Sequence, residues 1–160
     1  MAATQLDQAT EELALAARAQ WTSSGVRLGI DAVAVGNIEE SLTKFGERFL
    51  QRIFTPHEVL IANGSAERLA TRFAAKEAAI KAFDLSEAGV DWRDIELRSD
   101  ESGRPRLRLS GRALASALAF GVREPAVSLA HENGMALAVV VGLPQANARL
   151  QRSAAKTATA

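Results

Sequence analysis

SAERLATRFAAKEAAIKAF, residues 65–83, carries the most informative hydrophobic pattern of this sequence. Most of its residues are good helix formers. Its apolar stripe, at helical spacing, contains Leu69, Ala70, Phe73, Ala74 and Ile80. The pattern predicts a long helix with one apolar face. Glu77 falls on that same face, four residues after Phe73, where a charged side chain needs a specific reason.

The segments before this helix predict a buried strand and further helices. Residues 26–35 are almost wholly apolar, as in a strand that is buried on both faces. One amphipathic helix is expected next, with an apolar face made of Ile38, Leu42, Phe45, Phe49 and Ile53. Thr55, followed by Pro56 and Glu58, has the pattern of a capping box with proline at the first helical position, and predicts that a short helix starts there.

The segments after residue 83 predict strands and one more helix. Strands are expected at residues 90–98, 104–110, 127–132 and 135–141, and a helix is expected at residues 111–120. In the second strand leucines alternate with arginines, so one face is packed and the other is basic. Asn133-Gly134 is a strong hairpin signal. The order favours an α+β domain in which an antiparallel sheet packs against a long helix.

Length and composition limit the classes of protein and ligand. The 160 residues suit one compact domain, and 19 basic against 19 acidic side chains provide no overall positive field for nucleic acid. Cysteine is absent and histidine occurs only at His57 and His131, which excludes a disulfide framework and leaves too few ligands for zinc. A bound metal ion would have to be a hard ion with oxygen ligands. No apolar run approaches the ~20 residues of a membrane span, and the N-terminus has no signal-peptide pattern. We therefore expect a cytoplasmic protein without a membrane partner.

Composition divides the chain into three regions. Residues 1–24 are rich in helix formers with a narrow, alanine-rich stripe, and predict an N-terminal helical extension. Residues 25–144 form the expected working domain. Residues 145–160 have almost no large apolar side chain and predict a flexible C-terminal tail.

Two carboxylates lie on otherwise apolar elements. Asp31 stands in the first strand, where an ionised carboxylate is costly to bury without a partner. Asp31 could simply reach solvent or a backbone amide, and Glu77 could form an ordinary ion pair with Lys81, four residues later. Together the two carboxylates predict a Mg²⁺ site, because Mg²⁺ typically takes one or two carboxylates and completes its octahedron with water and phosphate oxygens. The neighbouring cations Arg72, Lys76 and Lys81 suit a phosphate-bearing ligand.

Five short segments occur in an order and at a spacing that match one family. They are Gly29-Ile30-Asp31, Arg48 to Glu58, Arg72 to Ala82, Gly103-Arg104-Pro105 and Ser128 to Glu132. On these segments, which span residues 27–143, the sequence resembles the holo-[acyl-carrier-protein] synthase type of 4′-phosphopantetheinyl transferase.

The resemblance implies a fold, a reaction and an assembly. The fold would be that of the 4′-phosphopantetheinyl transferases, with an extra N-terminal helix in this chain. The reaction would move the phosphopantetheine arm of coenzyme A onto a serine of apo acyl carrier protein, release adenosine 3′,5′-bisphosphate, and serve fatty acid or polyketide biosynthesis. Members of this short type generally form homotrimers with active sites between neighbouring chains.

The resemblance also implies roles for single residues. Asp31 and Glu77 would hold Mg²⁺, and Lys81 would compensate charge on the transferred phosphate, which makes these three the candidate catalytic residues. The candidates for binding coenzyme A are Arg72, Lys76, Lys81, His131, Gly103 and Pro105. The acceptor of the serine proton stays open between a metal-bound water and Glu77.

One position departs from the family pattern. Asn37 stands where the family commonly has an arginine that meets the carrier protein, so docking is expected to use Arg48 and Arg52 instead. The same departure leaves a second interpretation, a non-catalytic module of this fold that binds coenzyme A or a carrier protein. A nucleic-acid binder using the arginines of residues 104–112 is disfavoured by the neutral charge balance and the scarcity of aromatic residues.

Overall fold

The computed structural model describes residues 25–86 and 89–145. The predicted helical extension at residues 1–24, and all of the predicted tail after residue 145, lie outside the described residues. The elements follow one another as β1 (Arg27–Ala34), α2 (Val35–Phe45), α3 (Glu47–Ile53), α4 (Pro56–Ala62), α5 (Ala66–Ala82), the 3₁₀ helix η1 (Trp92–Asp94), β2 (Ile95–Ser99), β3 (Pro105–Leu109), α6 (Gly111–Ala119), β4 (Ala126–Glu132) and β5 (Met135–Gly142).

A three-stranded antiparallel sheet has the order β1-β5-β4, and β2 and β3 form a separate antiparallel hairpin. Strand β5 pairs with β1 along its whole length, from Arg27 opposite Gly142 to Ala34 opposite Met135. The turn between β4 and β5 is made by Asn133 and Gly134, whose φ angles are 51° and 74°. Two residues with positive φ are what a tight hairpin turn requires, so the predicted hairpin is confirmed.

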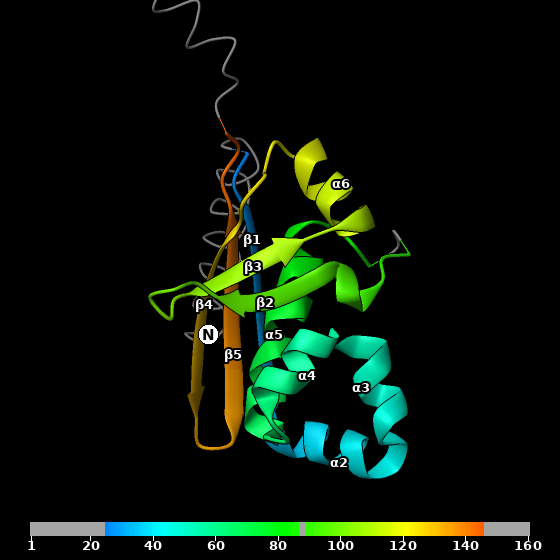
Figure 1. Cartoon of the computed structure of the whole chain (residues 1–160). Coiled ribbons are helices and arrows are strands. Elements are labelled where there is room, and N and C mark those ends of the chain that lie inside the picture. The colour runs from blue at the N-terminus through cyan, green and yellow to red at the C-terminus, as the bar shows by residue number, and fades with distance from the viewer. Residues whose placement is uncertain (1–24, 87–88, 146–160) are drawn as a thin grey trace, which may run out of the picture.

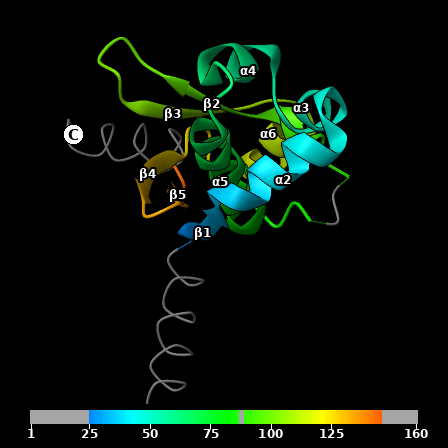
Figure 2. The same ribbon diagram turned by 90° about the horizontal axis from the view of Figure 1, so that it is seen from below.

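Helix α5 lies at the centre of the molecule. It packs along β1 and β5 on one side and contacts α2, α4 and β2 on others. Figures 1 and 2 show it between the three-stranded sheet and the layer that contains the hairpin and the shorter helices. Four of its alanines, Ala74, Ala75, Ala78 and Ala79, are fully buried. The small side chains let the sheet approach closely, and the expected arrangement of antiparallel sheet on long helix is confirmed.

The starts of helices α4 and α5 follow from local capping. Thr55 caps α4 through its side chain, and the backbone amide of Thr55 in turn donates to Glu58, so the predicted capping box is present. Ser65 accepts a hydrogen bond from the amide of Arg68 and caps α5. Among residues 25–86 and 89–145, none of the helices has the length and apolar character needed to cross a membrane.

The single amphipathic helix expected after β1 is wrong, because the chain forms two helices there. Gly46 interrupts the run with φ 53° and ψ −131°, a conformation outside the helical region that glycine adopts at little cost. Phe45, the last residue before the break, is 53% exposed.

The strand expected at residues 90–98 begins later than predicted, at Ile95. The Asp91 side chain accepts a hydrogen bond from the amide of Arg93 and caps the 3₁₀ turn of η1. A short polar side chain that bonds its own backbone favours such a turn over a strand.

Strand β1 is covered on one face only, so the expectation of a strand buried on both faces is wrong within the described residues of one chain. Val33 faces the core and is buried, whereas Ile30 is 57% exposed. On the same sheet, Leu28, Met135 and Leu137 are also partly exposed. The mostly apolar composition of β1 therefore belongs to a sheet whose second face is left uncovered by the described residues of the single chain.

Candidate functional site

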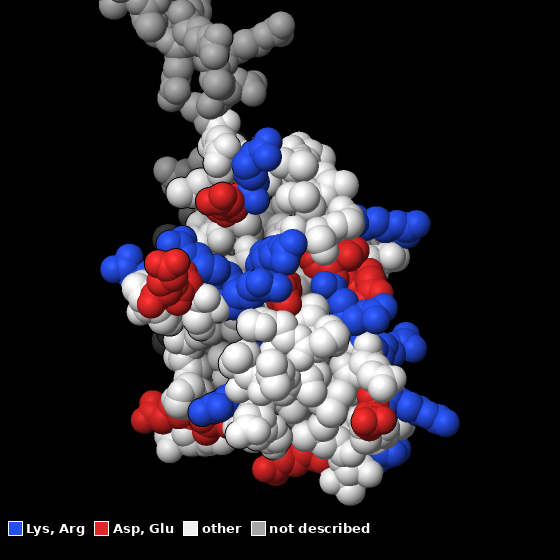
Figure 3. All heavy atoms as spheres, viewed as in Figure 1, with Lys and Arg blue, Asp and Glu red and all other residues white. Residues whose placement is uncertain are grey.

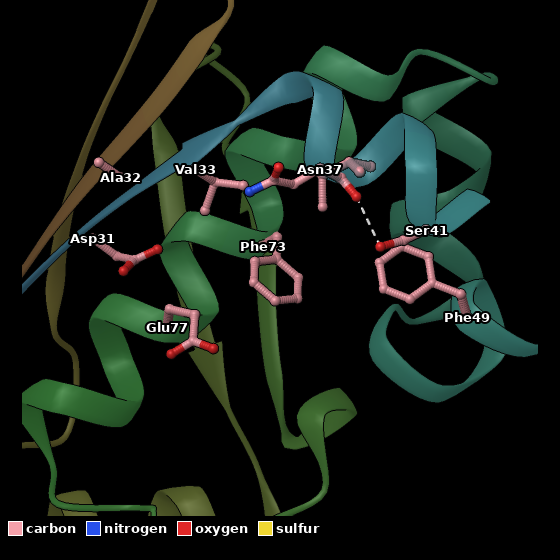
Figure 4. Close-up of a pocket in the computed structure, with 9 residues that line it drawn as sticks. Asp31, Ala32, Val33, Asn37, Ser41, Phe49, Phe73 and Glu77 are labelled. Atoms are coloured by element: carbon pink, nitrogen blue, oxygen red, sulfur yellow. Dashed lines mark hydrogen bonds between the residues drawn. The ribbon is translucent and has the colours of Figure 1, made fainter. Parts of the chain in front are cut away.

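Two acidic side chains meet where β1 crosses α5. Asp31 comes from the middle of β1, and Glu77 comes from the middle of α5. Figure 4 shows their carboxyl groups close to one another at one end of a cavity of about 450 Å³. The other lining residues include Asn37 and Ser41 from α2, and Phe73 from α5. The structure therefore brings together the two carboxylates that the sequence singled out.

Lys81 completes this cluster. Its Nζ atom lies 2.7 Å from Oδ1 of Asp31, and it also donates a hydrogen bond of 3.2 Å to the carbonyl oxygen of Ile30. Asp31 is thus neither free in solvent nor held by a backbone amide; its side chain is 14% exposed and paired with Lys81. Among the described ion pairs, Lys81 pairs with Asp31 rather than with Glu77.

The Glu77 carboxyl group is held in an unfavourable electrostatic setting. Partial burial raises the pKa of Glu77, the neighbouring Asp31 carboxylate raises it further, and Lys81 opposes both effects. A carboxylate pair of this kind is stabilised by a cation between its members. In the described part of the chain no cluster of three or more His, Cys, Asp or Glu side chains is present. Two carboxylates, with room beside them for water and phosphate oxygens, fit the ligand set of Mg²⁺.

A second cavity, of about 520 Å³, collects the other expected ligand-binding residues. Its lining includes Arg72, Gly103, Pro105 and His131, which come from α5, the β2–β3 turn, β3 and β4. Nδ1 of His131 lies 3.5 Å from Oε1 of Glu67. Four of the six predicted coenzyme A ligands thus share one cavity although they lie far apart in the sequence.

Arg72 carries a donor that needs a partner. Its Nε atom is buried and has no hydrogen-bond partner among the described residues, and burial lowers the pKa of its guanidinium group. An unsatisfied buried donor is costly, and the oxygens of a phosphate would satisfy it. The geometry of Arg72 therefore fits an anionic ligand in this cavity.

Sequence reasoning missed two arginines of the second cavity. Arg68 and Arg98 also line it. The spacing of Arg68, four residues before Arg72, was a usable signal because residues at i and i+4 lie on one face of a helix. Arg98 gave no such signal, since its place depends on how the β2–β3 hairpin folds onto α5.

The expected role of Lys76 in binding coenzyme A is wrong in this structure. Lys76 is fully buried, and its Nζ lies 2.9 Å from Oε2 of the equally buried Glu58. It also donates to the carbonyl oxygens of Trp92, at 3.0 Å, and Ile95. Burial lowers the pKa of Lys76, and the Glu58 carboxylate opposes this shift. Its donors are committed inside the protein, where a phosphate has no access.

Glu58 joins three elements around this lysine. Its Oε2 accepts a 2.9 Å hydrogen bond from the amide of Thr55, and its Oε1 accepts a 3.0 Å bond from the amide of Leu97 in β2. With Lys76 from α5, this carboxylate ties α4, β2 and α5 together. The sequence predicted the capping box but not its ion pair.

Two further groups of basic side chains lie on the surface. Arg48 and Arg52, on α3, are exposed, while Phe49 between them lines the first cavity. Figure 3 shows basic side chains gathered over the β2–β3 hairpin, where Arg106 and Arg108 are 66% and 64% exposed. The leucines of β3 face the core, so the predicted basic and packed faces of this strand are confirmed.

Comparison with known proteins gives consistent matches. Residues 27–140 match a family model described as the 4′-phosphopantetheinyl transferase superfamily. A holo-[acyl-carrier-protein] synthase of Herpetosiphon aurantiacus is 39% identical over 122 residues, which cover 72% of this chain and 96% of the relative. A protein of the same name from Solidesulfovibrio magneticus is 47% identical over 116 residues, covering 71% of this chain and 94% of the relative.

Solved structures match as well. The crystal structure of Helicobacter pylori holo-[acyl-carrier-protein] synthase in complex with coenzyme A has a TM-score of 0.64 and 29% identity to this chain. The match covers 71% of this chain and 96% of that structure. The sequence comparison and the structure comparison therefore both match proteins named holo-[acyl-carrier-protein] synthase.

Proposed function

This chain belongs to the 4′-phosphopantetheinyl transferase superfamily, and we propose that it acts as a holo-[acyl-carrier-protein] synthase. It transfers the 4′-phosphopantetheine group of coenzyme A to a serine of apo acyl carrier protein and releases adenosine 3′,5′-bisphosphate. We place this reaction in the cytoplasm, in fatty acid or polyketide biosynthesis. The observation that carries the proposal is the meeting of the Asp31 and Glu77 carboxyl groups beside Lys81.

Asp31 and Glu77 are the proposed ligands of Mg²⁺. They come from two different elements, and their mutual repulsion makes a cation favourable between them. When bound, Mg²⁺ would neutralise the pyrophosphate oxygens of coenzyme A and stabilise the leaving phosphate. Such charge neutralisation and alignment are the main requirements of phosphoryl transfer, which needs no protein nucleophile.

Lys81 and the second cavity bind the rest of the donor substrate. Lys81 is half-exposed next to Asp31, where its ammonium group can meet the transferred phosphate. Arg72 and His131 supply hydrogen-bond donors for other phosphates of coenzyme A, and Gly103 and Pro105 shape the wall of that cavity. In the reaction the serine oxygen bonds to the phosphorus of the pantetheine phosphate, and the bond from this phosphorus to the adenosine bisphosphate oxygen breaks.

The uncovered apolar face of the three-stranded sheet supports a homotrimer with active sites between chains. Ile30 is 57% exposed on this face, and Leu28 and Leu137 are exposed by about a third. Contiguous exposed apolar patches mark protein contacts. Light scattering of the full chain should give a trimer mass, and Ile30→Asp should dissociate it, whereas Ile61→Asp on α4 should not.

Arg48 and Arg52 are the proposed docking residues for the carrier protein. Both are exposed on α3, the helix whose Phe49 lines the cavity of Asp31 and Glu77. An acidic partner held there would present its serine near the proposed metal site, and charge complementarity would raise the rate of encounter.

Mass spectrometry of apo acyl carrier protein tests the proposed reaction. Incubation with the full chain, coenzyme A and Mg²⁺ should add one phosphopantetheine group, and Asp31→Ala or Glu77→Ala should prevent it. No mass gain with several carrier proteins, together with retained binding of coenzyme A or carrier protein by both variants, would instead support the non-catalytic binding module.

A further inference from the structure

Strand β1 and helix α5 approach each other very closely at Gly29. A Cβ atom on Gly29 would lie 1.9 Å from the carbonyl oxygen of Ala78 and 2.8 Å from the amide nitrogen of Ala82. Both neighbours are backbone atoms, which cannot rotate away as a side chain can. Gly29 lies within a regular strand, so this position requires space rather than an unusual backbone conformation.

This contact adjoins the proposed metal site. Asp31 follows Gly29 by two residues and therefore leaves β1 on the same, helix-facing side. On α5, Glu77 immediately precedes Ala78, and Lys81 immediately precedes Ala82. The separation of strand and helix at Gly29 thus sets the separation of the side chains that meet beside it.

We propose that Gly29 is a positioning residue for the metal site, and this inference rests on the function proposed above. Having no side chain, Gly29 fixes β1 at the distance from α5 at which Asp31 and Glu77 can share one Mg²⁺ ion. An alanine would have to move by more than an ångström to reach even a tight 3.0 Å contact. Mg²⁺ demands near-octahedral geometry with ligands at about 2.0–2.1 Å, whereas Ca²⁺ accepts longer and less regular contacts. Gly29 itself touches no substrate.

Gly142 provides a matched control. It lies on β5, opposite Arg27 of β1, and its Cβ atom would meet side-chain atoms of Phe83 at 2.9 Å and of Val122 at 3.0 Å. Gly142→Ala therefore also crowds the packed side of the sheet, but away from Asp31 and Glu77. A general loss of packing would affect both variants, whereas a positional effect on the metal site would affect only Gly29→Ala.

The test measures metal binding by the full chain with calorimetry, in the presence of coenzyme A. Gly29→Ala should weaken Mg²⁺ binding by about ten- to a hundredfold, as expected when residues that orient metal ligands are changed, and should weaken Ca²⁺ binding less. Gly142→Ala should bind Mg²⁺ within about twofold of wild type, since it leaves the ligand residues in place. If Gly29→Ala does not fold, Ala82→Val adds bulk at the buried helix position that faces Gly29, and the same selective loss of Mg²⁺ affinity is expected.

Two results would overturn the inference in distinguishable ways. Wild-type Mg²⁺ affinity in folded Gly29→Ala, or in Ala82→Val if that variant is needed, would show that the strand–helix distance does not control the site. A wild-type chain that neither binds Mg²⁺ nor modifies carrier protein would remove the proposed function itself, and the role of Gly29 with it.

Discussion

Helix α5 carries two lysines that each pair with a carboxylate, and the two pairs have opposite surroundings. The Lys76–Glu58 pair spans 2.9 Å, and both side chains are 0% exposed. The Lys81–Asp31 pair spans 2.7 Å, but its side chains are 51% and 14% exposed. Lys76 also bonds two backbone carbonyls, whereas the second pair has the Glu77 carboxyl crowded against it.

The difference separates a structural role from a functional one. A buried ion pair with all its donors and acceptors bonded has nothing to offer a ligand, and its loss leaves an uncompensated charge inside the protein. A half-exposed cluster with excess negative charge lowers its free energy by taking up a cation, and perturbed carboxylates of this kind gather at functional sites. Lys76, with a structural role, and Lys81, with a proposed functional role, lie only five positions apart on α5.

The largest effect on stability is expected from breaking the buried pair. Lys76→Met should lower the free energy of unfolding by about 3–5 kcal/mol, because Glu58 remains buried without its partner. Urea unfolding followed by circular dichroism measures this loss. The double variant Lys76→Met with Glu58→Leu should regain part of it, and a loss below about 1 kcal/mol in the single variant would show that the pair is not structural.

Replacing the Glu77 carboxylate is expected to lower activity without lowering stability. Glu77→Gln should lower the rate of phosphopantetheine transfer by about 10²–10³-fold, the size expected when a charge-stabilising group is lost, while the free energy of unfolding is maintained or increased. Glu101→Gln, in the exposed turn of the β2–β3 hairpin, is the control for loss of one negative charge. Transfer at the wild-type rate by Glu77→Gln would contradict the proposed site.

Much of this comparison could be predicted from local sequence patterns. The apolar stripe of residues 65–83, the capping box at Thr55 and the turn at Asn133-Gly134 each depend on neighbours in the chain, and each formed as expected. The convergence of Asp31 and Glu77 was predictable because both carboxylates were out of place on apolar elements.

The features that were missed depend on contacts between distant residues. Lys76 and Lys81 look alike in sequence, and only the approach of α4 and β2 to α5 decides that Lys76 meets Glu58 in the interior. Gly46 could have been recognised as a helix break, but the apolar residues before and after it continue the same helical period. The uncovered face of β1 could not be anticipated either, since an apolar strand does not say whether its cover comes from the same chain.

A smaller effect on activity is expected when Lys81, the half-exposed member of the Lys81–Asp31 pair, is replaced. Lys81→Met should slow transfer by about ten- to a hundredfold, the kinetic equivalent of the ~1.5–3 kcal/mol of a charged hydrogen bond. Its unfolding free energy should fall by only about 0.2–1 kcal/mol, because the lysine is half-exposed. Lys44→Met on α2 is the matched control. A stability loss as large as that of Lys76→Met would show that the two lysines have the same structural role.

The smallest effect is a pH dependence of stability without metal. Because the pKa of Glu77 is raised above its ordinary value of 4.5 in the folded chain, the folded state holds this proton more tightly than the unfolded state. Wild type should therefore lose stability relative to Glu77→Gln as the pH rises from 4.5 through the raised pKa. Urea unfolding of both proteins in a chelating buffer, from acid to neutral pH, measures the difference. Added Mg²⁺ should reverse it, because only the wild type gains from binding the ion. A relative stability of wild type that instead increases with pH in the absence of metal would mean that the Glu77 carboxylate is already compensated by Lys81, and that the cluster has no excess charge for a cation to neutralise.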